Sequence, residues 1–235
     1  MNQFYTPPEN ISGKELLITD DEAKHAAKVL RKREGEIILV TDGCGNRYIC
    51  RIDRIGKRNI QATITDKLSF DPAPYATELC MGLIRKRDRL EFAAEKATEL
   101  GISKLSFFHA DHTEPFNVRV DRLEATVLSA MKQSLRAYLP EISMFNSLDE
   151  ALERDLSQTT ILQADPDGMG MEVTDFDEMN RRLLVIGPEG GLSEREMDLL
   201  SRYNRQLISL GDYRLRAETA AMIMTAKFVY KKSRS

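Results

Sequence analysis

The last two-thirds of the sequence alternates between short apolar runs and longer segments with helical periodicity. The apolar runs, each of a length typical of a buried strand, cover residues 76–84, 104–110, 141–145, 159–165, 182–187 and 205–211. The helical segments cover residues 88–101, 119–139, 147–156, 193–203 and 218–232. This alternation predicts an α/β fold in which a mostly parallel sheet is covered by helices on both faces. Ligands of such sheets bind beyond the carboxyl ends of the strands, here in the loops after Leu162, Ile186 and Leu210.

The ends of several predicted helices carry their own signals. Asp88, Ser147 and Ser193 are each followed three residues later by a glutamate, which is the spacing of a capping box. Gly101 follows one helix directly, as a residue that accepts a left-handed backbone. The long segment 119–139 is expected to remain helical up to Pro140, which cannot continue a helix.

The first 70 residues or so predict a small, barrel-like β module that also contains a short helix. The helix is expected over 21–35, with Asp20 or Asp21 as its cap. Strands are expected over 37–40, 48–52 and 59–68. Asp42 and Gly43 supply the turn between the first two strands, since glycine accepts positive φ. The sequence Asp-Pro-Ala-Pro at 71–74 resists both helix and central strand, and it therefore predicts a linker between domains 1–71 and 75–235.

Composition and charge narrow the class of protein. The 235 residues carry a net charge of −3, but residues 24–33 (KHAAKVLRKR) are strongly basic. Such a local basic face can bind phosphate, although an ordinary solvated helix end has the same composition. No apolar run approaches a membrane span, the N-terminus lacks the pattern of a signal peptide, and the three cysteines are irregularly spaced. We therefore expect a cytoplasmic protein without disulfides or a bound metal.

The segment Ile186–Gly191 is the strongest local signal of function. A buried strand leads directly into Gly-Pro-Glu-Gly-Gly and then into a capped helix. Glycines let the backbone approach a ligand closely, and exposed backbone groups could read an adenine edge. The segment matches neither a phosphate-binding P-loop nor a dinucleotide-binding fingerprint. A tight strand–helix connection without a ligand is the simpler alternative.

Cationic loops form a second group of signals. Arg214 and Arg216 lie in a short loop after a predicted strand, and Glu218 there is explained equally well by a helix start. Residues 85–89 place several cations at the start of a helix, where they are unfavourable unless an anion is bound; a solvated loop is the alternative. Arg136, with Gln133 and Ser134, could bind substrate or brace the sheet.

Five segments together resemble a known family. They are HAAKVLRKREG with the following DG turn, KATELGISKL, KQSLRAYLP, IGPEGGLSEREM and LGDYRLRAETA. In this order they closely resemble the RsmE family of 16S ribosomal RNA uridine N(3)-methyltransferases, a branch of the SPOUT or α/β-knot superfamily. One position departs from the pattern, because Lys132 stands where the family commonly has an acidic residue.

The resemblance implies a fold, a reaction and partners. Residues 1–71 would form a PUA-like or OB-like RNA-binding domain, and 75–235 a parallel-sheet domain closed by a trefoil knot. The protein would be a homodimer that uses S-adenosyl-L-methionine to methylate N(3) of a uridine in 16S ribosomal RNA of the small ribosomal subunit. Two alternatives remain open: a ribose 2′-O-methyltransferase of the same superfamily, and a non-catalytic RNA-binding assembly factor.

The resemblance also suggests roles for individual residues. Arg216 would stabilise negative charge on the uracil, and Glu218 is a candidate base that could instead cap or orient. The cofactor would be bound by Leu162, Ile186, Gly187, Pro188, Gly190, Gly191, Leu210, Gly211 and Leu215. The residues expected to bind RNA are His25, Arg31, Lys32, Arg33, Arg85, Arg87 and Arg136.

Overall fold

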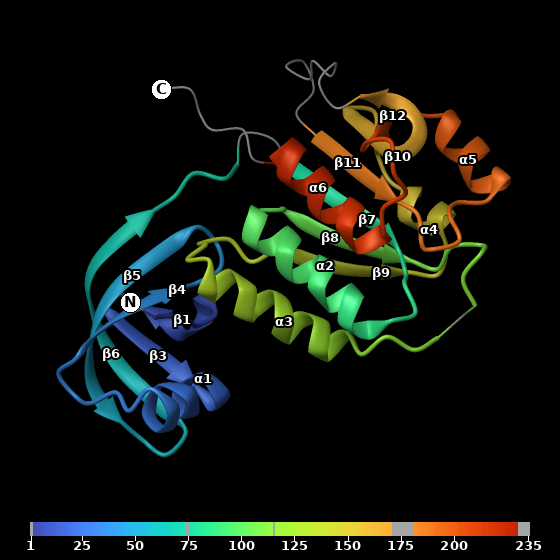
Figure 1. The fold of residues 1–235 in the computed structure, drawn as a ribbon. Coiled ribbons are helices and arrows are strands. Elements are labelled where there is room, and N and C mark those ends of the chain that lie inside the picture. The colour runs from blue at the N-terminus through green and yellow to red at the C-terminus, as the bar shows by residue number, and fades with distance from the viewer. Residues whose placement is uncertain (1, 74–75, 115, 171–180, 230–235) are drawn as a thin grey trace. The chain divides into compact units, whose positions relative to one another are not determined.

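A computed structural model describes residues 2–73, 76–114, 116–170 and 181–229 (Figure 1). The chain divides into two compact units. The N-terminal unit comprises the chain up to Pro72 together with Leu128–Leu139, and the C-terminal unit comprises Ala73–Val127 and the chain from Pro140 onward. Within the described ranges, no helix is long and apolar enough to cross a membrane.

The N-terminal unit is built on a six-stranded sheet in the order β1-β4-β5-β6-β3-β2. Its elements are β1 (Gln3–Tyr5), the 3-10 helix η1 (Pro8–Asn10), β2 (Ile11–Ser12), β3 (Glu15–Thr19), α1 (Asp20–Lys24), the π-helix η2 (His25–Val29), β4 (Ile37–Thr41), β5 (Asn46–Ile55) and β6 (Asn59–Ser69). Neighbouring strands are antiparallel except for the parallel pair β1 and β4. Phe4, Ile18, Ile38, Val40 and Ile52 are among the buried side chains of its core. A β module with a short helix is therefore confirmed in this part of the chain, and its barrel-like closure stays a prediction.

The predicted turn between β4 and β5 is confirmed, and a single carboxylate organises it. Asp42 accepts hydrogen bonds from the backbone N–H groups of Cys44 and Asn46, from the Asn46 amide and from the Tyr48 hydroxyl. Gly43 has φ of 73°, which suits glycine. Burial alone would raise the pKa of the Asp42 carboxyl, but these hydrogen bonds outweigh burial and lower it.

The helix predicted over 21–35 is wrong in its length and in its type. After α1 the backbone widens into the π-helix η2, and the Lys32 N–H donates to the Ala26 carbonyl. Arg31 then adopts a left-handed backbone with φ of 53°, which ends the helix. The basic residues 31–33 consequently lie in a loop rather than on a helix.

The long helix predicted to reach Pro140 is also too long. Helix α3 (Val120–Gln133) ends seven residues before Pro140, and Leu135 has φ of 55°. The segment after it packs into the N-terminal unit, where Gly45 N–H donates to the Ala137 carbonyl at 2.9 Å and Leu139 N–H to the Gly43 carbonyl at 2.8 Å. Leu128–Leu139 therefore belongs to the β module, although it lies more than 50 residues after the predicted linker.

The C-terminal unit contains a six-stranded sheet in the order β12-β10-β11-β7-β8-β9 (Figure 1). Its strands are β7 (Ala76–Gly82), β8 (Lys104–Phe108), β9 (Glu141–Phe145), β10 (Thr159–Gly170), β11 (Arg181–Ile186) and β12 (Arg205–Ser209). All five neighbouring pairs are parallel, so the predicted parallel α/β architecture is confirmed. The unit's further helices are α2 (Arg87–Leu100), α4 (Leu148–Leu152), α5 (Glu194–Ser201) and α6 (Ala217–Val229).

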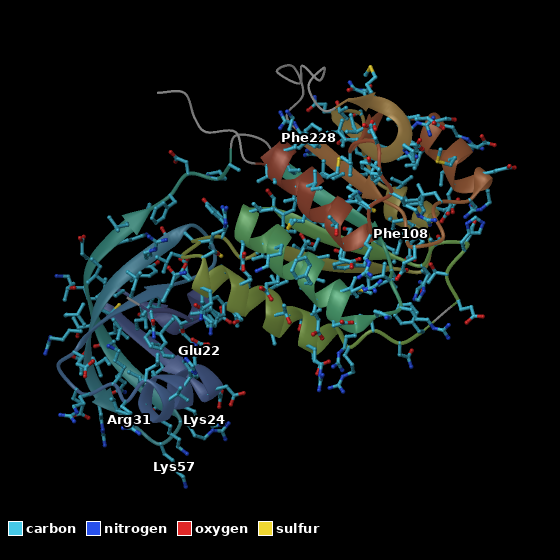
Figure 2. The ribbon with its side chains drawn as sticks, in the orientation of Figure 1. Glu22, Lys24, Arg31, Lys57, Phe108 and Phe228 are labelled. Atoms are coloured by element: carbon cyan, nitrogen blue, oxygen red, sulfur yellow. The ribbon has the colours of Figure 1, made fainter. Side chains whose placement is uncertain are left out.

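Both faces of this sheet are covered, as alternate side chains along the strands show. Cys80 and Phe108 pack in a core cluster with residues of α4 and α5. Their neighbours Leu79 and Phe107 point to the opposite face and are equally buried. Helix α6 packs on α2, β7 and β11, and the buried Arg182 of β11 donates to the carbonyl of Phe228 at 2.8 Å near the end of α6 (Figure 2).

The predicted helix ends are mostly confirmed. Ser193 and Glu196 form a capping box at the start of α5, Ser147 caps α4, and Gly101 ends α2 with φ of 98°. The predicted cap at Asp88 is wrong, because α2 begins one residue earlier and its preceding residue, Lys86, makes no side-chain cap.

Candidate cofactor pocket and active site

A cavity of about 790 Å³ lies in the C-terminal unit, between residues 163–166 of β10 and the loops that follow β11 and β12. Three stretches of chain supply its walls: 163–166, 186–192 and 210–217. Met197 of α5 and Ala220 of α6 complete the lining. The volume is in the range of small-molecule and cofactor sites, and the position beyond the carboxyl ends of parallel strands is the one expected for a ligand.

Eight of the nine residues proposed to bind cofactor line this cavity together with Arg216; the eight are Ile186, Gly187, Pro188, Gly190, Gly191, Leu210, Gly211 and Leu215. Leu162 is the exception, because its side chain is fully buried in the sheet and does not reach the cavity. The next residues of β10, Gln163 and Ala164, line the cavity instead. Strand β10 continues past the predicted end at 165, with a register shift between Ala164 and Met169. The predicted end of this strand is therefore wrong.

The glycine loop, residues 187–191, needs glycines for two different reasons. Gly191 has φ of 76°, a backbone that other residues rarely adopt, and its N–H donates to the Pro188 carbonyl at 2.9 Å. Gly187 is crowded instead, since a Cβ there would lie 3.1 Å from the backbone nitrogen of Leu192. The fold of this loop therefore requires glycine, which has no side chain, at both Gly187 and Gly191.

A third glycine, at the end of β7, controls how closely the loop approaches the sheet. A Cβ on Gly82 would lie 2.6 Å from Cδ and 2.9 Å from the nitrogen of Pro188. Neither atom can move away without moving the backbone or ring of Pro188. Gly82 therefore allows the glycine loop to rest on β7, a role that the sequence did not reveal.

The loop after β12 is fixed at both ends. The Arg214 guanidinium donates to the Glu189 carbonyl at 2.9 Å, which joins this loop to the glycine loop. The Arg216 carbonyl accepts from the N–H groups of Thr219 and Ala220 and so begins α6. The side chain of Arg216 is exposed at the cavity wall, where it can reach a bound substrate.

Glu218 lies outside the cavity, so the geometry does not support it as the base. Its side chain is 9% exposed, and one carboxylate oxygen lies 3.4 Å from Nε of Arg89 on α2. The other oxygen is buried and has no hydrogen-bond partner among the residues that the structure describes. This placement favours a role in holding α6 and Arg89 together.

The loop after β8 braces the glycine loop and the start of α5. Asp111 accepts hydrogen bonds from the Ser193 hydroxyl at 2.6 Å and from two nitrogens of Arg195. His112 places Nδ1 at 3.3 Å from the Gly190 carbonyl. Across the described ranges, no group of three or more His, Cys, Asp or Glu side chains is placed to bind a metal ion.

This bracing should depend on pH. Hydrogen bonds from Arg195 and then Ser193 lower the pKa of Asp111 to about 2 from its ordinary 3.8. Because the pKa is lower in the folded state, the stabilisation is complete well above pH 3.8 and is lost as the pH falls through 2. We expect Asp111→Asn to lower the free energy of unfolding more at pH 6 than at pH 3, as measured by urea denaturation. A difference that is the same at both pH values would contradict this prediction.

The residues proposed to bind RNA are divided between the two units. His25, Arg31 and Arg33 are exposed in the N-terminal unit, and Lys32 pairs with Glu36 at 2.9 Å. Figure 2 labels Lys24, Arg31 and Lys57 at the end of this unit where α1 meets the β5–β6 turn.

The remaining three predicted cations differ in their surroundings. In the C-terminal unit, Arg85 and Arg87 are exposed and pair with Glu114 at 3.2 Å and Glu91 at 3.3 Å. Arg136 is half-buried in the N-terminal unit, and its carbonyl accepts from Gln3 at 2.8 Å. This hydrogen bond joins the segment after α3 to β1 through the backbone, and the suggested role of the Arg136 side chain stays a prediction.

Comparisons with known proteins agree with this architecture. Ribosomal RNA small subunit methyltransferase E of Rickettsia conorii is 27% identical, over 96% of this chain and 94% of that protein. A crystal structure of the enzyme of that name from Neisseria gonorrhoeae, bound to S-adenosyl methionine, matches with a TM-score of 0.85 and 28% identity over 96% of this chain and 95% of that one. A probable rRNA-methyltransferase from Porphyromonas gingivalis matches with a TM-score of 0.81 and 28% identity over 98% and 100%.

Family models assign both parts of the chain. Residues 18–65 match an RNA methyltransferase PUA domain. Residues 71–229, which include every residue that lines the cavity, match an RNA methyltransferase domain. Since the second match covers more than half of the sequence, the chain belongs to the RNA methyltransferase family that this domain defines.

Proposed function

We propose that this protein transfers a methyl group from S-adenosyl-L-methionine to N(3) of a uridine in 16S ribosomal RNA of the small subunit. The observation that carries the proposal is the cavity that the glycine loop and the loop of Arg216 line together. The chain that forms this cavity belongs to a family of RNA methyltransferases. The solved relative bound to S-adenosyl methionine supports the cofactor, and the names of the relatives support the substrate.

The chemistry of the cavity suits this cofactor. Its apolar wall includes Ile186, Leu210 and Leu215, which can cover the adenosine, while the glycine loop offers backbone groups to the adenine edge. Carboxylates of Asp165 and Asp212 also line the cavity and favour the positive charges of the methionyl part. When bound, S-adenosylmethionine supplies the electrophilic methyl group.

Arg216 has the complementary task on the nucleophile. The ring imide nitrogen of uracil attacks poorly until its proton leaves, and the resulting negative charge spreads to O(2) and O(4). A guanidinium at the cavity wall can donate to these oxygens and stabilise that charge. We assign Glu218 a positioning role, because its carboxylate faces Arg89 rather than the cavity.

The finer architecture is part of the proposal. Residues 1–71, completed by 128–139, would form a PUA-like or OB-like barrel that binds RNA, and 75–235 a SPOUT domain. A trefoil knot would have 186–192 and 210–219 as its crossing loops. Its support is that α6 follows the edge strand β12 yet packs on β11, β7 and α2. We also propose a cytoplasmic location, as expected from the sequence, and a homodimer, which the resemblance to the RsmE family implies.

Nucleoside analysis tests the proposed reaction directly. Small ribosomal subunits from cells that lack this protein would be incubated with the purified protein and S-adenosylmethionine, then digested and analysed by mass spectrometry. The proposal expects 3-methyluridine in 16S ribosomal RNA. Ribose-methylated uridine would instead establish the 2′-O-methyltransferase, and calorimetry that detects no cofactor binding would favour the non-catalytic assembly factor.

The basic loop of the N-terminal unit should supply affinity through phosphate contacts. We expect Arg31→Glu with Arg33→Glu to weaken binding to the small subunit and to flatten its salt dependence, since each lost phosphate contact reduces the salt slope by about 1. Filter binding between 50 and 300 mM salt measures both. Arg119→Glu, which reverses an exposed arginine of the C-terminal unit paired with Asp121, is the matched control. Equal effects of the two changes would place the RNA-binding face elsewhere.

A further inference from the structure

Tyr213 is an exposed aromatic residue that does not pack in the core of the protein. Its side chain is 86% exposed, more than the other exposed large hydrophobic residues of the described chain, and it lines the cavity. Within the described part of the chain, its ring makes no aromatic or cation–π contact and its hydroxyl has no hydrogen-bond partner. An apolar ring left in water at the edge of a binding site suggests that it contacts something absent from the free protein.

The backbone that carries Tyr213 is held in place. Arg214, the next residue, donates to the Glu189 carbonyl, and the Arg216 carbonyl accepts from the first turn of α6. On the other side, Gly211 has φ of 122° and follows the end of β12. Tyr213 is therefore presented from a fixed loop, which lowers the entropy lost when its ring is covered.

The charges beside Tyr213 favour a neutral partner over a phosphate group. Its preceding neighbour Asp212 and Glu189, whose carbonyl accepts from Arg214, are exposed acidic residues that line the same cavity. The adjacent cation, Arg214, already donates to a carbonyl. Arg214 and Arg216 balance these two acidic residues, so no excess positive charge favours a phosphate here, whereas a nucleobase is uncharged and stacks on aromatic rings irrespective of its identity.

We propose that Tyr213 is a stacking platform for an unpaired base that flanks the target uridine of the RNA substrate. The target base has to enter the cavity to reach the cofactor, and the exposed ring of Tyr213 lies at the cavity's mouth, where the next base of a splayed strand would remain. Tyr213 is a positioning residue in this scheme. The inference rests on the proposed function, because it assumes an RNA strand at this cavity.

The absence of tryptophan from the sequence gives a direct binding test. In Tyr213→Trp, the indole at position 213 is the only tryptophan, and a base that stacks on it should quench its fluorescence. Short single-stranded RNA containing uridine is the probe. Phe92→Trp is the control, because Phe92 is an exposed aromatic of α2 that does not line the cavity. Quenching at position 213 but not at 92 supports the proposal, and equal quenching or none at both overturns it.

Kinetics with ribosomal RNA test whether the stacking matters for the reaction. Tyr213→Phe should keep the KM for the RNA substrate, whereas Tyr213→Ala should raise it by about 5- to 150-fold, the range measured when a base loses its aromatic platform. The cofactor Kd and the oligomeric state should be unchanged in both variants. The proposal is overturned if Tyr213→Ala keeps the wild-type KM. It is also overturned if the variant binds the cofactor more weakly, because Tyr213 would then contact the cofactor, or if its oligomeric state changes, because Tyr213 would then be a subunit contact. Failure of the proposed function can be distinguished from failure of this inference. In the first case the wild-type protein transfers no methyl group, and the fluorescence test still reports whether RNA stacks on position 213.

Discussion

Replacement of Arg216 by alanine should reduce methyl transfer by about 100- to 1000-fold, the typical cost of removing one donor that stabilises a developing anion. The fold should survive, because the Arg216 side chain is exposed and its contribution to the start of α6 comes from its backbone carbonyl. Cofactor affinity should also change little, because the positive charge of Arg216 acts on the uracil and not on the cofactor. Single-turnover transfer of labelled methyl groups measures the first effect, and calorimetry measures the second.

Two comparisons make the Arg216 result specific. Arg202→Ala, which removes another exposed arginine of the C-terminal unit, should leave methyl transfer at the wild-type rate because Arg202 does not line the cavity. Arg216→Lys should recover part of the activity, as it keeps the charge and loses the planar pair of donors. Wild-type turnover in Arg216→Ala would remove Arg216 from the chemistry and leave the negative charge on the uracil without its assigned stabilising cation.

Gly82→Ala should weaken cofactor binding at least about 10-fold and lower the free energy of unfolding by about 1–3 kcal/mol, the usual cost of overpacking. The added methyl group would lie 2.6 Å from the Pro188 ring, so the glycine loop has to move away from β7. Since 186–191 forms one wall of the cavity, that displacement changes the surface offered to the cofactor. Calorimetric titration and urea unfolding measure the two effects.

Two other glycines separate crowding from backbone strain. Gly170→Ala should be nearly silent, because a Cβ there meets no atom of the described residues within 4 Å and the glycine has no positive φ. Gly191→Ala also adds a methyl group in open space but forces a side chain onto φ of 76°, so it should destabilise the loop without a clash. If Gly82→Ala loses stability but binds cofactor as the wild type does, Pro188 is not part of the binding surface.

The local features of the fold were predictable from the sequence because short-range rules decide them. The Ser193 capping box and the Gly101 helix end follow from residues three or four positions apart. The site loops were found for a related reason, since a parallel sheet brings all its carboxyl ends to one edge. The sequence did not show which residue of β10 reaches the cavity. Leu162 is the predicted residue, but its side chain is buried in the sheet, and Gln163 lines the cavity.

The features that the sequence did not reveal depend on distant partners. The segment 134–139 keeps the apolar spacing of a helix, but Leu135 has a left-handed backbone, and Gly43 and Gly45 supply two of the segment's backbone hydrogen bonds. Glu218 was a candidate base because it is a carboxylate beside Arg216. Its pairing with Arg89, which is 129 positions earlier on α2, is visible only once the helices are packed.

The return of Leu128–Leu139 to the β module changes how this protein can be recombined. The chain passes between its two units after Pro72, Val127 and Leu139, so the β module is not a simple N-terminal appendage. A chimaera that exchanges only the first 72 residues with a relative would pair foreign loops with the native Ala137 and Leu139 backbone. Modular swaps therefore have to carry both pieces, and the two pieces can be expected to have changed together during divergence.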